Sequence, residues 1–172
     1  AVGSALPARA FPNDDLPAAL ETSDEWIKSR TGIAQRYIAS DDETTSSLAI
    51  AAARSALDSA GLKAEDIDGI IVATTTPDLT FPAVATMVQR ELGVPAGTLA
   101  FDVQAVCAGF IYAVGVADGL LQAGRMRRAI VIGSETMTRI LNWEDRTTCV
   151  LFGDGAGAVI MERDDSLDAL TG

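Results

Sequence analysis

The stretch LAFDVQAVCAGFIYAVGVADGLL, residues 99–121, decides the fold that the sequence predicts. Its first part is apolar and rich in residues that favour β-structure, so we expect a strand over residues 99–105. From Cys107 onward the apolar residues follow a helical pattern, and Gly124 ends a helix expected over residues 107–123. The stretch therefore predicts a strand that leads directly into a helix, with Cys107 at the junction.

Cys107 would lie in the first turn of this helix, where a thiol ionises most easily. The unpaired N–H groups and the positive end of the helix dipole stabilise a thiolate, which is the nucleophilic form. The small residues Ala108 and Gly109 would leave room for a substrate carbonyl. The alternative is a buried structural cysteine, the usual state of a free Cys. This stretch alone leaves both interpretations open.

Strand-like and helix-like segments alternate along the rest of the chain. The expected strands lie at residues 1–6, 68–74, 99–105 and 129–134, and the expected helices begin near residues 22, 40, 82 and 107 and end before Gly32, Gly61, Gly93 and Gly124. Alternation of this kind predicts βαβ units, with a mostly parallel sheet and helices on both faces. A Pro-rich loop is expected directly after the first strand.

Local signatures suggest how some of these elements begin. Capping boxes at residues 22–25 and 40–43 would start two helices, with Thr22 as the first cap, and Pro82 would be the first residue of a third helix. Asp102, in the middle of a strand, is interpreted as a structural or interface carboxylate.

The segment GDGAG, residues 153–157, lacks the Lys-Ser/Thr of a phosphate-binding loop, and an apolar strand follows it where a dinucleotide-binding motif needs a helix. We therefore expect a tight turn between strands at residues 149–152 and 158–162.

Composition limits the classes of function. The 172 residues suit one domain, and 13 Lys+Arg against 24 Asp+Glu give a net charge of −11, which argues against nucleic acid and anionic membranes as partners. The longest uncharged apolar stretch, residues 104–117, is shorter than the roughly 18 residues that cross a bilayer. Two cysteines without a signal-peptide pattern favour a reducing cytoplasm. The chain has no histidine, so no metal site is expected and no histidine of this chain can activate a nucleophile.

Several motifs together resemble one known family. They are TSDEWIKSRTGI (22–33), TFPAVA (80–85), AFDVQAVCAGF (100–110), EDR (144–146) and FGDGAGAV (152–159). In this order and spacing they are similar to the β-ketoacyl-acyl-carrier-protein synthase III family of thiolase-fold condensing enzymes. The resemblance implies an α/β, thiolase-like fold, built as one βαβαβαββ half with a mostly parallel mixed sheet covered by helices.

The resemblance extends through residues 1–172 but covers only the amino-terminal half of that family's protein. We therefore expect a single amino-terminal half-domain that carries the nucleophile, and a chain that starts as a fragment, without an initiator Met. The carboxy-terminal half, which would supply a His and an Asn, is expected to be absent from this chain.

The resemblance also implies roles for individual residues. Cys107 would take an acyl group from acyl-CoA, and its backbone N–H would help to stabilise the oxyanion. Trp26 and Arg30, four residues apart, would hold the CoA nucleotide by stacking and by charge; Arg146 would contact the other side of the adenine, and Thr22 would be a weaker contact. Without the resemblance, a half-buried Trp and two solvated arginines would be the simpler interpretation.

Two further residues are assigned to the acyl pocket by resemblance. Phe81 would cross the interface of a homodimer to form a wall of the partner's pocket, the alternative being a core aromatic. Met137 lies where a side chain of the acyl pocket is expected, although residues 140–145 differ from the better-known members of the family. The preference for acyl chain length therefore stays open.

The implied function has two steps. Cys107 takes an acyl primer from acyl-CoA, and malonyl-acyl-carrier protein is then decarboxylated and condensed to a 3-oxoacyl product, with the CoA thioester as substrate and no cofactor. The second step needs the His and Asn that this chain lacks. Two alternatives are a related starter condensing enzyme of polyketide or quinolone synthesis, and a non-catalytic module for acyl-CoA binding or dimerisation.

Overall fold

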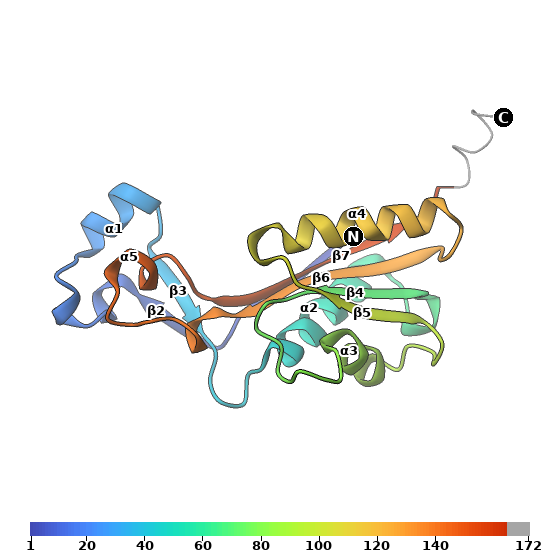
Figure 1. Cartoon of the computed structure of the whole chain (residues 1–172), viewed down its shortest axis with the longest axis horizontal. Helices are drawn as coiled ribbons and strands as arrows, with labels where there is room; N and C mark the ends of the chain where they lie inside the picture. The colour runs from blue at the N-terminus through green and yellow to red at the C-terminus, as the bar shows by residue number, and fades with distance from the viewer. Residues whose placement is uncertain (165–172) are drawn as a thin grey trace.

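The computed structural model describes residues 1–164, which form a larger and a smaller part (Figure 1). The larger part is a five-stranded sheet covered by helices on both faces. The smaller part is a two-stranded sheet with two short helices. Two long strands of the large sheet, β6 and β7, extend towards the smaller part and connect the two.

The large sheet has the strand order β1-β7-β6-β4-β5. Only β7 runs against the other four strands, because β1 and β6 pair with it antiparallel while β4 pairs parallel with both β5 and β6. This confirms the expected mostly parallel mixed sheet. The strands are β1 Val2–Ala5, β4 Gly69–Ala73, β5 Leu99–Val103, β6 Arg128–Thr136 and β7 Asp154–Glu162.

Helices α2 and α3 cover one face of this sheet, and α4 covers the other (Figure 1). Their bounds are Thr45–Ala60, Val84–Leu92 and Gly109–Gln122. The order β1-α2-β4-α3-β5-α4-β6-β7 is the expected βαβαβαββ succession, and the smaller part is built from two insertions, one between β1 and α2 and one between β6 and β7. Alanines of α2 pack this helix tightly: a Cβ on Gly3 of β1 would lie only 2.3 Å from the Ala52 carbonyl oxygen. Glycine therefore lets strand and helix touch.

The smaller part pairs strand β2 (Arg9–Pro12) antiparallel with β3 (Gln35–Ile38), and carries helices α1 (Asp24–Thr31) and α5 (Arg146–Cys149). Its core is an apolar cluster that includes Phe11 and the buried Cys149. The expected Pro-rich loop after residue 6 was thus wrong in part, because β2 forms by pairing with a strand that is distant in the sequence. Short 3-10 helices occupy Asn13–Asp15, Ala18–Leu20, Ala64–Asp66, Val106–Ala108 and Met137–Arg139.

Two of the expected helix caps were wrong. Helix α1 is capped by Ser23, whose Oγ accepts a hydrogen bond from the Trp26 N–H at 3.1 Å, and not by Thr22. Helix α2 is capped by Thr44, and the Glu43 carboxylate instead closes a turn by accepting from Ser40. A capping-box pattern fixes the spacing of its residues, but neighbouring Ser and Thr residues offer several starting points.

Helix α3 begins at Val84, so Pro82 precedes the helix and is not its first residue, as had been expected. Asp102 on β5 replaces a side-chain cap: its two oxygens accept from the N–H groups of Val84 and Ala85, each at 2.8 Å. A carboxylate at a helix amino terminus satisfies free donors and opposes the positive end of the dipole. The structural interpretation of Asp102 is confirmed.

The hairpin expected around residues 153–157 was also wrong. This segment leads into one continuous strand, β7, and the strand expected at residues 149–152 is absent: α5 ends at Cys149, and a turn follows it. The glycines of this segment allow neighbouring segments to pack closely against it. A Cβ on Gly153 would lie 3.0 Å from the Arg36 Cβ, and one on Gly155 would lie 3.2 Å from the Leu6 side chain. In the described part of the chain, no helix is long and apolar enough to span a bilayer.

Candidate active site

Cys107 lies on a sharp turn between β5 and α4. The expected strand and helix are confirmed, but the α-helix starts at Gly109, and Cys107 sits in the 3-10 turn Val106–Ala108 before it. Val106 has a φ of 47°, in the left-handed region that a β-branched residue rarely adopts. This strained turn presents the Cys107 side chain at the surface and places it just before the amino terminus of α4.

The exposed thiol opens into a pocket of about 250 Å³ at the carboxyl ends of the parallel strands. In open α/β sheets this edge is the usual place for ligands. Small residues of β6 and β7 form much of the lining, and a Cβ on Gly133 would come within 3.4 Å of the Phe110 ring. The lining consists of Ala73, Val106, Cys107, Phe110, Gly133, Ser134, Glu135, Gly155, Ala156 and Gly157.

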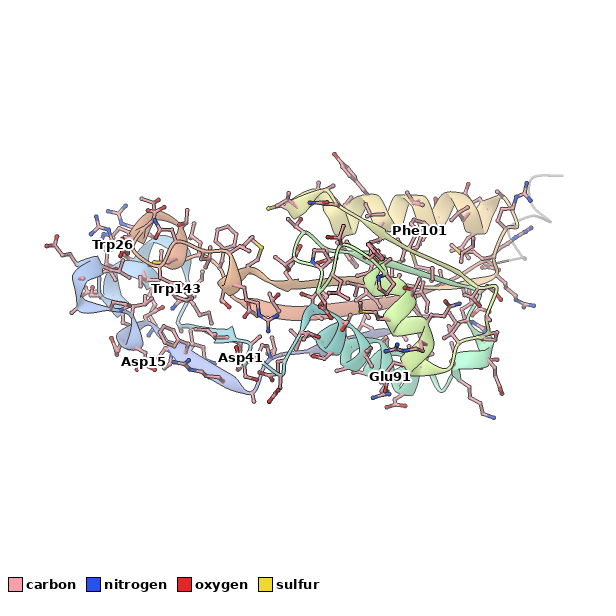
Figure 2. All side chains as sticks on the ribbon, turned by 60° about the horizontal axis from the view of Figure 1, so that its bottom comes forward. Asp15, Trp26, Asp41, Glu91, Phe101 and Trp143 are labelled. Atoms are coloured by element: carbon pink, nitrogen blue, oxygen red, sulfur yellow. The ribbon has the colours of Figure 1, made fainter. Side chains whose placement is uncertain are left out.

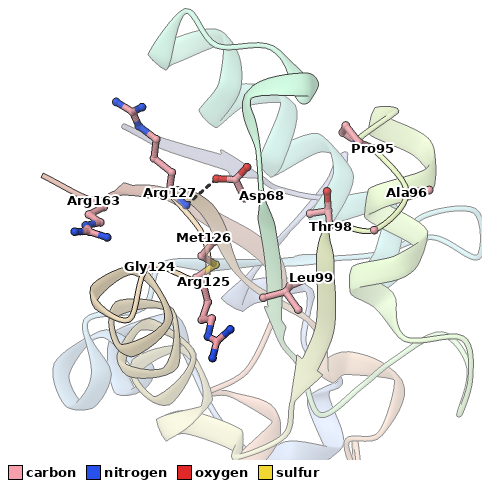
Figure 3. Close-up of a pocket in the computed structure, with 11 residues that line it drawn as sticks. Asp68, Pro95, Ala96, Thr98, Leu99, Gly124, Arg125, Met126, Arg127 and Arg163 are labelled. Carbon is pink, nitrogen blue, oxygen red and sulfur yellow. Dashed lines mark hydrogen bonds between the residues drawn. The ribbon is translucent and has the colours of Figure 1, made fainter. Parts of the chain in front are cut away.

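A larger hollow, of about 710 Å³, lies at the opposite edge of the sheet (Figure 3). It is lined by residues at the starts of β4 and β5, such as Asp68 and Leu99, and by Arg125 and Arg127 after α4. Neither cysteine lines it. The pocket beside Cys107 is therefore the better candidate for an active site, although it is smaller.

Glu135 is a pocket residue that sequence reasoning missed. Its carboxylate accepts hydrogen bonds from the N–H groups of Thr75 and Thr76, at 2.8 and 3.0 Å, and from the hydroxyls of Thr74 and Thr76. These bonds attach the loop after β4 to β6 at the edge of the pocket. Because Oε2 accepts three of these hydrogen bonds and Oε1 accepts the fourth, Glu135 supports the shape of the pocket and is a poor candidate for a general base.

The two thiols differ in a way that alkylation can measure. Cys107 is exposed, whereas Cys149 is fully buried and burial raises the pKa of its thiol. We expect iodoacetamide to modify Cys107 at neutral pH roughly tenfold or more faster than Cys149, because both access and thiolate fraction limit the buried thiol. Peptide mapping by mass spectrometry during a time course would measure both rates. Equal rates would contradict an activated nucleophile at Cys107.

A second cluster joins α1 and α5 in the smaller part. The guanidinium carbon of Arg30 lies 4.8 Å from the centroid of the Trp26 ring, and that of Arg146 lies 5.1 Å from it. Trp26 is half-buried at the end of the smaller part, away from the large sheet (Figure 2). The structure thus brings together three residues that are separated by up to 120 positions, and an indole beside two guanidinium groups suits an aromatic base that carries phosphates.

Local hydrogen bonds hold Arg146 in this cluster. Asp145 caps α5 by accepting from Thr147, and these bonds hold the pKa of the Asp145 carboxyl below its usual value. Arg146 Nη1 donates to the Glu21 carbonyl at 2.9 Å, which ties α5 to the loop before α1. Thr22 lies next to that contact, and its buried hydroxyl has no hydrogen-bond partner among the described residues.

Neither of the two residues expected in the acyl pocket lines the pocket beside Cys107. Phe81, in the loop before α3, is 82% exposed, which excludes the core-aromatic alternative. Met137 begins the 3-10 turn after β6 and is half-buried, but it does not line the pocket beside Cys107. Their roles in an acyl pocket stay predictions.

Comparisons with known proteins agree on one family. A family model described as 3-oxoacyl-[acyl-carrier-protein (ACP)] synthase III matches residues 101–171. The curated β-ketoacyl-[acyl-carrier-protein] synthase III of Erythrobacter litoralis is 62% identical over 160 residues, which are 93% of this chain and 50% of that protein. The protein of the same name from Chelativorans is 62% identical over 164 residues, with 95% and 50% covered.

Solved structures show the same fold. The 3-oxoacyl-[acyl-carrier-protein] synthase III of Aquifex aeolicus matches with a TM-score of 0.90 and 47% identity, covering 95% of this chain and 53% of that one. The priming β-ketosynthase of the R1128 polyketide pathway also matches with a TM-score of 0.90, at 37% identity, covering 95% and 49%. The expected thiolase-like fold is confirmed by these neighbours.

The chain spans about half the length of the curated relatives that it matches. Within that half the identity is high and extends over nearly all of this sequence, and the order of strands and helices agrees with the solved structures. Over nearly all of its length, the chain is therefore similar to about half of a β-ketoacyl-[acyl-carrier-protein] synthase III.

Proposed function

We propose that the protein to which this chain belongs starts fatty acid synthesis as a β-ketoacyl-[acyl-carrier-protein] synthase III. It would transfer an acyl group from acyl-CoA to Cys107 and then condense that group with malonyl-acyl-carrier protein. The observation that carries this proposal is the exposed thiol of Cys107, held on a strained turn before α4 and open to a pocket at the carboxyl ends of the strands.

In the proposed first step, the Cys107 thiolate attacks the thioester carbonyl of acyl-CoA. A new C–S bond forms through a tetrahedral oxyanion, and the bond to CoA breaks, so that CoA leaves as a thiol after taking up a proton. The backbone N–H of Cys107 would be one donor to the oxyanion. The CoA thioester is a substrate here, and the step needs no cofactor.

In the proposed second step, the malonyl thioester loses CO2, and the resulting carbanion attacks the carbonyl of the acyl group on Cys107. A C–C bond forms, the C–S bond to Cys107 breaks, and the Cys107 thiolate is released as the 3-oxoacyl product forms. A His and an Asn would stabilise the carbanion, and this chain has no histidine. We propose that they come from a carboxy-terminal half, and that residues 1–172 form the amino-terminal half. The lengths of the curated relatives, about twice that of this chain, support that division.

The other partners follow from the same proposal. The protein would be a homodimer, in which the exposed Phe81 reaches the partner's acyl pocket and Met137 contributes to its own. The cytoplasm is the proposed location, which suits two free thiols. Nucleic acid and membranes are not proposed as partners, because the net charge of −11 repels both.

A second candidate, priming of polyketide synthesis, is favoured by one observation. The R1128 priming β-ketosynthase has the same TM-score as the Aquifex aeolicus enzyme. The identity is nevertheless lower, at 37% against 47%, and the curated relatives at 62% identity carry the name β-ketoacyl-[acyl-carrier-protein] synthase III. We therefore place the fatty acid reaction first.

The test is to incubate the full-length protein with acetyl-CoA and with longer acyl-CoAs, and then to measure its intact mass and the modified peptide. The proposal expects one acyl group on Cys107 and, after malonyl-acyl-carrier protein is added, release of a 3-oxoacyl product. A protein that binds acyl-CoA without forming an adduct would instead be a non-catalytic module. The longest acyl group accepted would separate a short-chain primer enzyme from a polyketide starter enzyme.

Replacing Trp26 with alanine should weaken CoA binding by roughly 1 to 3 kcal/mol, because a stacking surface for the adenine is lost. Isothermal titration of CoA into the full-length Cys107→Ala protein would measure this without turnover. Trp143→Phe is the control, since Trp143 packs on Phe11 inside the smaller part, whereas Arg30 and Arg146 lie over the Trp26 ring. An unchanged affinity for Trp26→Ala would remove Trp26 from the nucleotide site.

A further inference from the structure

Arg36 is a buried cation that the proposed chemistry does not use. It lies on β3, is only 5% exposed, and forms no ion pair with a carboxylate among residues 1–164. Its Nε and Nη1 are buried and make no hydrogen bond to any described residue. Burial lowers the pKa of the guanidinium, although arginine stays protonated at neutral pH.

Such a group is costly to bury. Removing a charge from water without a counter-charge costs several kcal/mol even when some of its donors are satisfied. A methionine of similar length would fill the same space in the apolar cluster of the smaller part without that cost. Packing of β3 alone therefore does not explain a cation at this position.

The two hydrogen bonds that Arg36 makes lead to the two helices of the Trp26 cluster. Its Nη2 donates to the Asn13 Oδ1 at 2.8 Å and to the Val150 carbonyl at 3.1 Å. Val150 directly follows α5, the helix that starts with Arg146. One nitrogen of Arg36 thus contacts the end of α5 and Asn13 at the same time.

Asn13 continues this network to α1. Its Nδ2 donates to the Asp24 carboxylate at 2.9 Å and to the Ile33 carbonyl at 2.7 Å. Asp24 is the first residue of α1, and Ile33 follows its carboxyl end. Asn13 therefore holds both ends of the helix that carries Trp26, and Arg36 connects this helix to α5.

We propose that Arg36 is a positioning residue for the nucleotide of acyl-CoA. It fixes α1 relative to α5, so that Trp26 and Arg30 on the first helix face Arg146 on the second at the spacing that the adenine and its phosphates need. Arg36 itself does not touch the ligand. This inference rests on the proposed function, because it assigns the Trp26 cluster to CoA.

The test compares two thioesters in the full-length protein. Acetyl-CoA carries the nucleotide, whereas acetyl-pantetheine offers the same reacting carbonyl without it. For Arg36→Met we expect the KM for acetyl-CoA to rise roughly tenfold with kcat nearly unchanged, and kcat/KM for acetyl-pantetheine to stay within about twofold of the unsubstituted protein. Arg9→Met, on the exposed neighbouring strand β2, is the control and should change neither substrate.

If Arg36→Met lowered kcat/KM equally for both thioesters, Arg36 would have a merely structural role and the inference would be overturned. An unchanged kcat/KM for both thioesters would overturn it as well. If Arg36→Met does not fold, Asn13→Ala is the second test, because it removes the link to α1 while Arg36 keeps its hydrogen bond to Val150. A rise in KM for acetyl-CoA alone would support the inference. Without that selective rise, the inference would be overturned. An unsubstituted protein that forms no acyl group on Cys107, or that uses both thioesters equally well, would count against the proposed function instead.

Discussion

Replacing Cys107 with alanine is expected to abolish acyl transfer from acyl-CoA to the protein. The sulfur is the only atom proposed to form the new bond, and the other thiol cannot replace it, because Cys149 is fully buried in the smaller part and burial raises its pKa. Removing a covalent nucleophile commonly costs several orders of magnitude in rate. Intact mass after incubation of the full-length protein with acetyl-CoA should show no adduct.

The same substitution should leave the fold intact. Cys107 is exposed, so alanine creates no cavity in the core, and substitutions at such positions usually change the free energy of unfolding by no more than about 0.5 kcal/mol. Circular dichroism and a thermal melt would verify this. Cys149→Ala is the matched control and should keep one acyl group per chain. An adduct that persists in Cys107→Ala would assign the nucleophile to another residue.

Local patterns predicted the strands and helices of the large sheet well. The segments that became β4 and β6 are short apolar runs that are buried on both faces, and the glycines at residues 61 and 93 end α2 and α3 as expected. Such signals lie within a few neighbouring residues. These signals fail where pairing between distant segments decides the secondary structure. Segment β2 is a strand because β3 lies beside it, and β7 continues through its glycines because β1 and β6 flank it.

The residues of the candidate site were likewise predictable where the signal is local, and were missed where it depends on distant segments. Cys107 could be found from the junction of a strand with a helix, and the pairing of Trp26 with Arg30 follows from their spacing on one helix. Arg146 was placed only by resemblance to a family, since no spacing rule connects it to Trp26. Glu135 and Arg36 were missed altogether, because their roles depend on hydrogen bonds to segments that are distant in the sequence.

Asp154 explains why the motif at residues 153–157 was misread, and it carries a large expected effect. The carboxylate is 5% exposed and accepts three hydrogen bonds. Its Oδ1 accepts from the Thr138 N–H at 2.9 Å; its Oδ2 accepts from the Thr138 hydroxyl at 2.6 Å and from the Ala39 N–H at 2.8 Å. Asp154 thus ties the start of β7 to the turn after β6 and to the residue that follows β3. The acidic residue of this motif is a structural anchor between the two parts of the chain.

Substituting Asp154 with asparagine should lower the free energy of unfolding by about 1 to 3 kcal/mol, although the side chain keeps its shape. Each carboxylate oxygen accepts from a backbone N–H, so either orientation of the amide points its NH2 group at another donor and leaves a buried N–H of Thr138 or Ala39 unpaired. Denaturant titration of the full-length protein would measure the loss against Asp41→Asn, the same change at an exposed position (Figure 2). If the two variants were equally stable, Asp154 would not be the anchor, and contacts of β7 with β1 and β6 would have to hold the smaller part in place.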